Sequence, residues 1–408
     1  MLSLFIILIK VSYDSSVLNL KLLFNASRSQ ASLQLLSTLL FISYSLNSHA
    51  QADTYESEKP YNIQWETDIT SYSPTQSIDS FTDDWDEPLE NGDFAYIQGR
   101  SDIRYSTDQS PLSYALNYRY DYLLSFNPAT AQVYWDYKNN KLPSENRRYP
   151  LMLTADYSER LGFGIANQFE LPKQWQITPQ LNIWQGLHGL TGTLKGDLTT
   201  KTAYDEQRKL VDTVSVANID LSYQYDKPAL KEDRIGWQPN KPNGIGYSLD
   251  LHINGKLPYD TTLMVDAYDV LGKMYWHDMP ITDYNFNYSA IGRPPYTLEG
   301  QLSKKDLSQN LPWHVQTAIE KRFTPAWSLG LYSEFNDVTN LHQLALTHHT
   351  QFKLKRTPLT MTGLLEPQTK AIGLQVKHKD FGISYLADDL NMNDAKRVAL
   401  NFFVRHDW

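Results

Sequence analysis

The chain has 408 residues, no Cys and a formal net charge of −9. The lack of Cys excludes disulfides, thiolate zinc sites and Cys nucleophiles. The acidic balance argues against a nucleic-acid partner, because phosphate backbones are bound by basic faces. Aromatic residues make up 13% and hydrophobic residues only 41%, a combination that fits a chain in which apolar and polar residues alternate.

The amino-terminal segment predicts export. Arg28 precedes an apolar run over residues 33–42, and Ala50 and Ala52 follow with small residues at the spacing of a signal-peptidase site. The run is too short for a membrane-spanning helix. We therefore expect residues 1–52 to be a signal or targeting segment, with residues 1–27 an over-long gene start. An N-terminal membrane anchor is the alternative.

Residues 53–408 show a period of two, which indicates β-strands with one apolar and one polar face. Residues 112–126 are the most regular, with Leu116 and Tyr118 on one parity and Asn117 and Arg119 on the other. If these strands close into a barrel, the alternative for part of the segment 53–110 is a plug inside that barrel or a portion in the periplasm. Strands in this first half are predicted near 61–70, 94–106, 112–126, 130–138, 149–157, 160–171, 174–185, 187–198 and 213–225.

The middle of the chain predicts a long external loop. Strands are expected near 244–255 and 261–271, and the stretch 272–312 follows them. Its aromatic and basic residues suggest a loop that folds inward or contacts a glycan; a loop that packs on its neighbours is the alternative. The candidate loop residues are Trp276, Tyr284, Phe286, Arg293 and Tyr296.

The last third predicts a series of hairpins with alternately short and long connections. If the C-terminus is periplasmic, every long connection here falls outside, as in outer-membrane barrels. Strands are expected near 313–323, 327–335, 342–354, 359–365, 371–378, 381–387 and 397–408. Simple counting gives about 18 strands, and we expect 14 to 18.

The final strand carries a further signal, because Phe402, Val404, His406 and Trp408 share one parity. This ending resembles the assembly signal of Gram-negative outer-membrane β-barrel proteins. His406, Trp408 in place of Phe, and Phe403 in place of Gly depart from the pattern. The resemblance implies an all-β antiparallel transmembrane barrel in the outer membrane of a Gram-negative bacterium. Its expected partners are the barrel-assembly machinery and outer-membrane lipid, including lipopolysaccharide.

The polar parity predicts a charged lumen, and the sequence shows no catalytic motif, cofactor motif or metal-ligand spacing. We therefore expect a passive channel or transport component for small polar solutes, and not an enzyme. An outer-membrane hydrolase, and a structural or adhesive barrel with ligand-binding external loops, are the alternatives. The candidate lumen residues are Arg119, Asp121, Asp250, His252, Asp266, Glu320, Glu334 and Arg405.

We predict that export removes the segment ending at Ala50 or Ala52, because both follow the apolar run with small residues at the required spacing. N-terminal sequencing of protein extracted from membranes measures the mature start. A mature chain that still contains Leu33 would contradict this prediction.

Overall fold

The computed structural model describes residues 61–82, 85–139, 141, 146–204, 210–226, 236–354 and 357–408. The expected targeting segment, residues 1–52, lies outside the described residues. The helices are α4 (Ile78–Thr82) and α5 (Pro128–Lys138). The strands are β1 (Tyr61–Tyr72), β2 (Phe94–Thr107), β3 (Ser110–Phe126), β4 (Arg148–Asn167), β5 (Phe169–Leu171), β6 (Trp175–Tyr204), β7 (Leu210–Tyr225), β8 (Asn243–Leu257), β9 (Thr261–Ser289), β10 (Tyr296–Asn310), β11 (His314–Arg322), β12 (Trp327–Asn336), β13 (Asn340–Leu354), β14 (Thr357–Glu366), β15 (Ala371–Lys377), β16 (Phe381–Ala387) and β17 (Arg397–Asp407).

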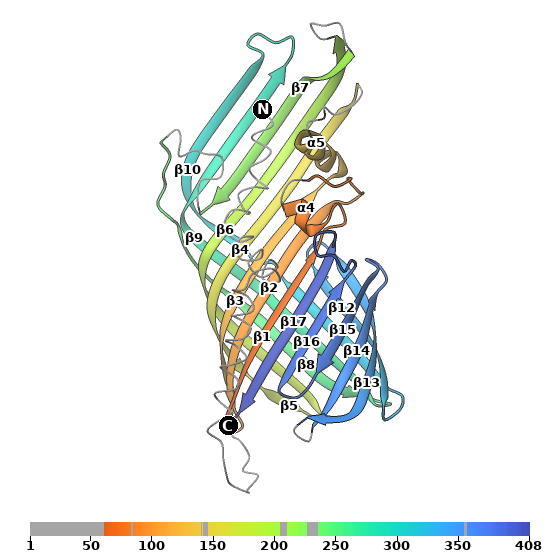
Figure 1. Ribbon diagram of the computed structural model, residues 1–408. Helices are drawn as coiled ribbons and strands as arrows, with labels where there is room; N and C mark the ends of the chain where they lie inside the picture. The colour runs from red at the N-terminus through yellow and green to blue at the C-terminus, as the bar shows by residue number, and fades with distance from the viewer. Residues whose placement is uncertain are drawn as a thin grey trace, which may run out of the picture. The chain divides into compact units, whose positions relative to one another are not determined.

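The strands form a closed antiparallel barrel with 14 strands in its wall (Figure 1). Closure comes from β1, which pairs with β2 on one edge and with β17 on the other, from Asn62 opposite Asp407 to Tyr72 opposite Arg397. A closed wall leaves no unpaired backbone edge, which a bilayer requires. The predicted fold class is confirmed. The strand registers give the order around the wall as β1, β2, β3, β4, β6, β8, β9, β11, β12, β13, β14, β15, β16 and β17.

The wall is apolar outside and polar inside. Leu116, Leu329 and Leu374 are each more than half exposed on the outer face. Asn117 and Asp250, on the other parity, are fully buried within the barrel. Because strand side chains alternate between faces, this is the arrangement of a barrel placed in a bilayer. Both ends of the described chain meet at the lower end in Figure 1, where the backbones of Tyr61 and Trp408 are hydrogen-bonded at 3.1 and 3.3 Å.

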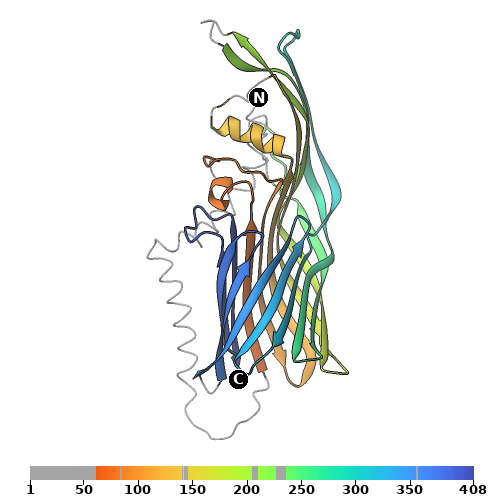
Figure 2. The same cartoon turned by 90° about the vertical axis from the view of Figure 1, so that its right-hand side faces the viewer.

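Two strands are far longer than a bilayer requires. β6 has 30 residues and β9 has 29, or about 100 Å each at roughly 3.3 Å per residue, against an apolar band about 25 Å tall. Their lower halves lie in the wall. Their upper halves form a second sheet above it (Figures 1 and 2), in which β4, β6, β7, β9 and β10 are neighbours in that order. We call this sheet the extension.

The extension begins where a large indole fills the junction with the wall. Trp276 of β9 is 1% exposed, and its Nε1 donates to Gln309 Oε1 at 3.1 Å. A Cβ added at Gly186, Gly189 or Gly244 would lie within 2.5 Å of this ring. These three glycines therefore leave the space in which Trp276 packs, and they fix where β7 replaces β8 as the neighbour of β6.

The structure corrects four sequence predictions. Residues 130–138 form helix α5 instead of a strand, because Asn127 caps the helix and Pro128 occupies its first turn. The predicted loop 272–312 is instead the paired upper part of β9 and strand β10. The two strands predicted near 149–157 and 160–171 lie mainly in one strand, β4. The two predicted near 174–185 and 187–198 are one strand, β6, and the simple count of about 18 wall strands is therefore too high.

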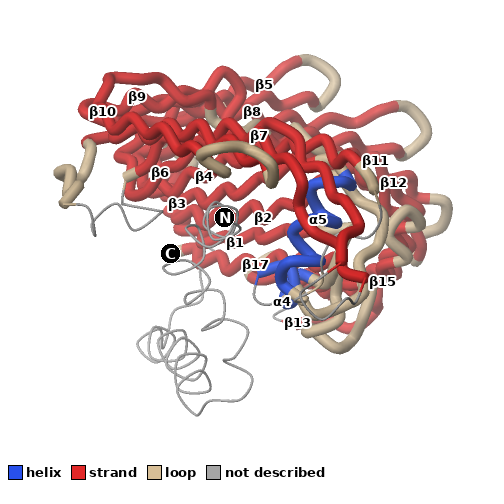
Figure 3. Tube along the Cα trace, turned by 90° about the horizontal axis from the view of Figure 1, so that it is seen from above, coloured by secondary structure: helices blue, strands red, loops and turns tan. Residues whose placement is uncertain are grey.

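The gap 199–212 between the predicted strands near 187–198 and 213–225 contains the end of β6 and the start of β7, with residues 205–209 outside the described part. β6 runs to the top of the extension, β7 returns from there, and β8 continues downward in the wall. Residues 61–72 and 94–107, from the segment for which a plug was considered, form β1 and β2 of the wall. Helices α4 and α5 lie in the upper connections (Figure 3). Of the helices that the structure describes, none is long and apolar enough to span a membrane.

The two faces predict opposite results for neighbouring substitutions. Leu374→Arg places a cation against lipid and should destabilise the barrel by about 2–4 kcal/mol. Gln375→Arg places the same cation on the inner face and should change stability little. Denaturant titration of each variant folded into lipid vesicles measures the difference. Equal destabilisation of both variants would contradict the assignment of faces.

Candidate functional site

A row of three arginines crosses the inner wall. Arg100 of β2 is the direct cross-strand partner of Arg119 of β3, and Arg119 is the partner of Arg160 of β4. All three side chains are 7% exposed or less. Like charges directly opposite one another on a sheet repel, and a buried charge is costly unless it is paired. The arginine row therefore requires counter-charges.

Aspartates from the wall and from across the interior supply those charges. Arg160 donates to Asp121 at 2.6 Å and to Asp269 at 2.7 Å. Arg119 donates to Asp102 and, at 3.3 Å, to Asp250. Asp250 lies on β8 and Asp269 on β9, each three positions along the wall from the strand of its arginine, so these ion pairs reach over the intervening strands inside the barrel.

Trp184 of β6 packs within the same network. Its Nε1 donates to Ser248 Oγ at 2.9 Å. The guanidinium carbons of Arg119 and Arg160 lie 5.5 and 5.1 Å from the centre of its ring, within the range of a cation–π contact. This aromatic face helps to hold two like charges close together.

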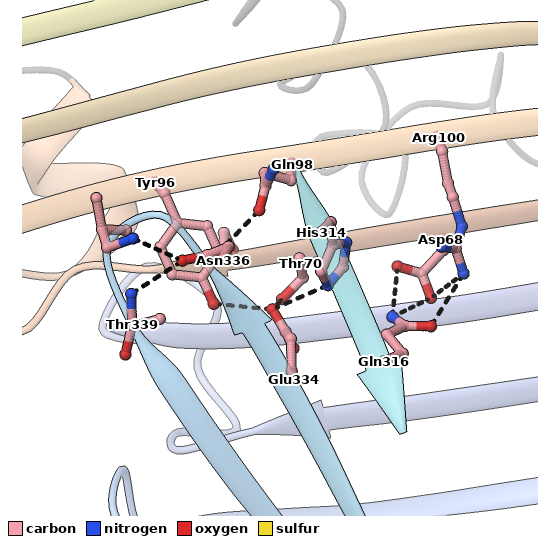
Figure 4. Close-up of polar contacts among 12 residues, drawn as sticks. Asp68, Thr70, Tyr96, Gln98, Arg100, His314, Gln316, Glu334, Asn336 and Thr339 are labelled. Carbon is pink, nitrogen blue, oxygen red and sulfur yellow. Dashed lines mark hydrogen bonds and ion pairs between the residues drawn. The ribbon is translucent and has the colours of Figure 1, made fainter. Parts of the chain in front are cut away.

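Side chains from opposite walls also bond to each other directly (Figure 4). In the wall order, β11 lies seven positions from β1, and β12 lies seven positions from β2, so each pair stands on opposite sides of a 14-strand ring. Yet Tyr96 donates to Glu334 at 3.0 Å and Asn336 to Gln98 at 2.9 Å. A barrel of eight strands is already filled by its side chains. Direct contact across 14 strands therefore requires a flattened cross-section at this level.

The same contact continues below. Arg100 Nη2 donates to Gln316 Oε1 at 3.0 Å, and the Gln316 amide nitrogen lies 3.5 Å from both carboxylate oxygens of Asp68. The guanidinium of Arg100 also stacks over the ring of Tyr268 at 3.6 Å. We call these bridging residues the septum, because they join opposite walls across the interior. They are Asp68, Thr70, Tyr96, Gln98 and Arg100 on one wall, and Gln316, Glu334 and Asn336 on the other.

Arg397 fixes the upper end of the septum. Its guanidinium, fully buried, donates to Glu334 at 2.8 Å and to Glu366 at 3.0 and 3.2 Å. It also donates to the Thr70 hydroxyl, which in turn donates to Glu334 at 2.9 Å. One cation thus connects β1, β12, β14 and β17, and holds the carboxylate that bridges the septum.

The structure separates the predicted lumen residues into several groups. Arg119, Asp121 and Asp250 belong to the network of the arginine row, and Glu334 belongs to the septum. His252 and Asp266 lie lower in the barrel and form a hydrogen bond of 2.8 Å with each other. Glu320 accepts a hydrogen bond from Ser328, and Arg405, at the lower rim, is exposed and donates to Asp407 at 2.9 Å.

The predicted loop residues are found in strands or at a strand turn. Trp276 is buried in the junction, and Tyr284 and Phe286 lie in the upper half of β9. Arg293 lies in the β9–β10 turn, and Tyr296 is the first residue of β10 and is 61% exposed. At the lower end, Trp408 stacks near Tyr61, Tyr105 and His406, with ring centres 5.8 to 6.5 Å apart.

Sequence reasoning missed Arg100, Arg160, Asp269 and Arg397. Arg100 lies between Gly99 and Ser101, and Arg160 follows Ser158 and Glu159, so neither stands out on one parity. Register also shifts beside Arg160 and around Asp269, which has a left-handed φ of 56°. A weak signal for Arg397 was its position at the start of the regular final strand.

Several contacts among the described residues are of a kind that a hydrolase would use; the two around His349 and His252 lack the required geometry. Ser328 Oγ lies 3.0 Å from His349 Nε2. However, Glu320 contacts the serine and lies on the same side of the imidazole at 4.0 Å, whereas a catalytic acid orients the other ring nitrogen. In the second cluster, His252 Nδ1 meets Asp266 while Nε2 faces the guanidinium of Arg104 at 3.5 Å, so the nitrogen that would act as a base faces a cation.

No protein-family model matches this chain, and no curated protein matches it in sequence. Among solved structures, the toluene transporter TbuX of Ralstonia pickettii is 8% identical over 86% of this chain and 90% of its own, with a TM-score of 0.36. A deltaS2S3 mutant of the TodX monoaromatic hydrocarbon channel is 8% identical over 86% of this chain and 90% of its own, with a TM-score of 0.38. The Escherichia coli outer membrane protease OmpT is 9% identical over 88% of this chain and 99% of its own, with a TM-score of 0.22. With every TM-score below 0.5, the fold assignment rests on the strand pairing described above.

The network predicts a large effect of removing one arginine. Arg160→Ala leaves buried Asp121 without its cation and Asp269 with only Arg119, 3.7 Å away, and should destabilise the barrel by about 3–5 kcal/mol. Arg148→Ala is the matched control, because Arg148 is 72% exposed and its ion pair with Asp197 lies in the extension. Denaturant titration in lipid vesicles compares the two. Similar small losses in both variants would contradict a role for the arginine row in holding the barrel together.

Proposed function

We propose that this protein is an outer-membrane β-barrel that passes small polar solutes passively. The observation that carries the proposal is the closed 14-strand wall, apolar outside and lined inside with charged and amide side chains. A wall of this kind is stable only in a bilayer, and its interior suits water and polar solutes. The upper end, with its long connections and the extension, is then the outside of the cell.

The chemistry of the interior favours a polar cargo. TbuX and TodX are named for toluene and monoaromatic hydrocarbons, but an apolar molecule gains little beside an arginine row and buried carboxylates, which it would desolvate. Arg100 Nη1, Arg119 Nε, Arg160 Nε and Asn117 Oδ1 have no hydrogen-bond partner among the described residues. These atoms can bond to a polar solute or to water that enters the network.

The charges of the interior favour cations. Among the described residues, four buried guanidiniums, those of Arg100, Arg119, Arg160 and Arg397, form ion pairs with twice as many carboxylates. These carboxylates belong to Glu66, Asp68, Asp102, Asp121, Asp250, Asp269, Glu334 and Glu366. A surplus of fixed negative charge in a low-dielectric wall attracts cations and repels anions. Mild cation preference is therefore part of the proposal.

The septum narrows the path of a solute through the resting barrel. Its hydrogen bonds join opposite walls at two levels, through Tyr96–Glu334 and through Arg100–Gln316. A solute crosses where these side chains part. Each of these bonds involves a charged group and is worth about 1.5–3 kcal/mol net, so side-chain movement can open them while the strand pairing of the wall stays intact.

A second candidate function is a binding barrel whose external part holds a partner. The extension favours it, because a sheet built from β4, β6, β7, β9 and β10 is more than a closed pore needs. Conduction separates the two functions: a binding barrel with a filled interior does not conduct when its septum is weakened.

We predict that weakening the septum raises conductance. In planar bilayers the wild-type protein should give small steps, and the double variant Arg100→Ala/Gln316→Ala should increase the single-channel conductance about twofold or more by removing side chains from the path. Gln375→Ala, on the inner face outside the septum, is the control and should behave like wild type. Folded protein that conducts in none of these forms would contradict the channel proposal and favour the binding barrel.

A further inference from the structure

Strand β10 has a free edge. Its register with β9 runs from Tyr296 opposite Tyr288 to Asn310 opposite Lys273. Among the strand registers of the described residues, β10 pairs with β9 alone. Figure 3 shows β10 at the margin of the strand array. The extension therefore ends in an edge that the closed wall does not have.

The backbone groups at this edge can be identified. Ser289 N donates to Pro295 O at 2.8 Å, so the odd-numbered residues of upper β10 bond to β9. Antiparallel pairing alternates. The N–H and C=O groups of the even-numbered residues, Tyr296, Leu298, Gly300, Leu302 and Lys304, therefore point to the free side.

Upper β10 carries few of the features by which edge strands avoid pairing with other chains. Natural edges are kept short or are interrupted by Pro, a bulge or inward charges. Residues 296–304 contain no Pro, and the register is unbroken until the shift between Lys305 and Leu307. Tyr296 and Leu298 are 61% and 49% exposed on one face. Glu299, together with Lys304 and Lys305 at the lower end, supplies the charge typical of a protected edge.

We propose that the free edge of β10 receives an extended segment of a different polypeptide by β-strand addition. Backbone hydrogen bonds supply the affinity in this mode, and alternate side chains supply the specificity. The face of Tyr296, Leu298 and Leu302 selects apolar residues at alternate positions of the partner. Glu299, on the other face, selects a basic residue, and Lys304 an acidic one.

Symmetry argues against a second copy of this chain as the occupant. Two identical antiparallel edges are related by a two-fold axis perpendicular to the strands. Two copies in one membrane must share an axis along the membrane normal. Both conditions hold only for a strand parallel to the membrane, whereas β10 runs steeply, like the wall strands below it (Figure 1). A strand from another protein has no such restriction.

The test uses a synthetic nonapeptide, Glu-Thr-Val-Thr-Val-Lys-Val-Thr-Val, which places Lys beside Glu299 and Glu beside Lys304 when paired antiparallel. Full-length protein in lipid nanodiscs is titrated with the labelled peptide, and amide hydrogen exchange is followed across residues 296–304. Leu298→Pro removes an edge-facing N–H without disturbing the bonds to β9. Leu298→Thr retains that N–H and is the matched control, and gel mobility with and without heating confirms that each variant is folded.

We expect saturable binding to wild type and slowed exchange at Leu298 and Leu302. Binding should be at least about tenfold weaker for Leu298→Pro, which is about 1.4 kcal/mol. Leu298→Thr should lose clearly less affinity than Leu298→Pro, because it keeps the edge N–H and loses only the apolar contact of Leu298. Absence of peptide binding to the folded wild type, or equal binding by Leu298→Pro, would overturn the proposal. Self-association of the wild type that Leu298→Pro abolishes would replace the partner by a second copy. Because β10 lies outside the wall, none of these results bears on conductance.

Discussion

Three guanidinium groups side by side on one inner wall are the constraint on which the interior depends. Arg100, Arg119 and Arg160 are direct cross-strand neighbours, and their mutual repulsion in a low-dielectric interior must be offset by carboxylates close by. Aspartates of β3, β8 and β9 provide much of this compensation. Because β8 and β9 lie three positions away along the wall, the charges meet inside the barrel and not along one strand pair. Arg100 belongs both to the arginine row and to the septum, so it connects the electrostatics of the row to the contact between opposite walls.

The wall and the extension solve different problems with the same strands. In the wall, closure between β1 and β17 pairs every edge, as lipid demands. Above it, β6 and β9 continue into an open sheet, which water permits because its edge groups can be solvated. The change of partner, from β8 to β7 beside β6, occurs at the glycine-lined space around Trp276. A single buried indole therefore marks the level at which the constraints of the membrane end.

The sequence predicts the wall well and its interior only in part. Alternation identifies Arg119, Asp121 and Asp250 as inward residues, because each is flanked by apolar residues of opposite parity. Arg100 and Arg160 lack that contrast, and the register shift beside Arg160 obscures the period further. The predicted loop 272–312 does contain an alternating Tyr284, Phe286 and Tyr288. Its partners β7 and β10 could not be inferred from local pattern, since long-range pairing leaves no local signal. The septum is similarly hidden, because it depends on which strands stand opposite one another in the closed ring.

The direct contact between opposite walls is the central claim, and short-range cross-linking tests it most directly. The chain has no Cys, so Asp68→Cys and Gln316→Cys introduce the only two thiols, on strands seven positions apart in the ring. In folded protein the account predicts efficient linkage by a short bis-methanethiosulfonate reagent, seen as a mobility shift on a denaturing gel that reductant reverses. Linkage by long flexible reagents alone, with both thiols accessible, would show an open round lumen and contradict the account.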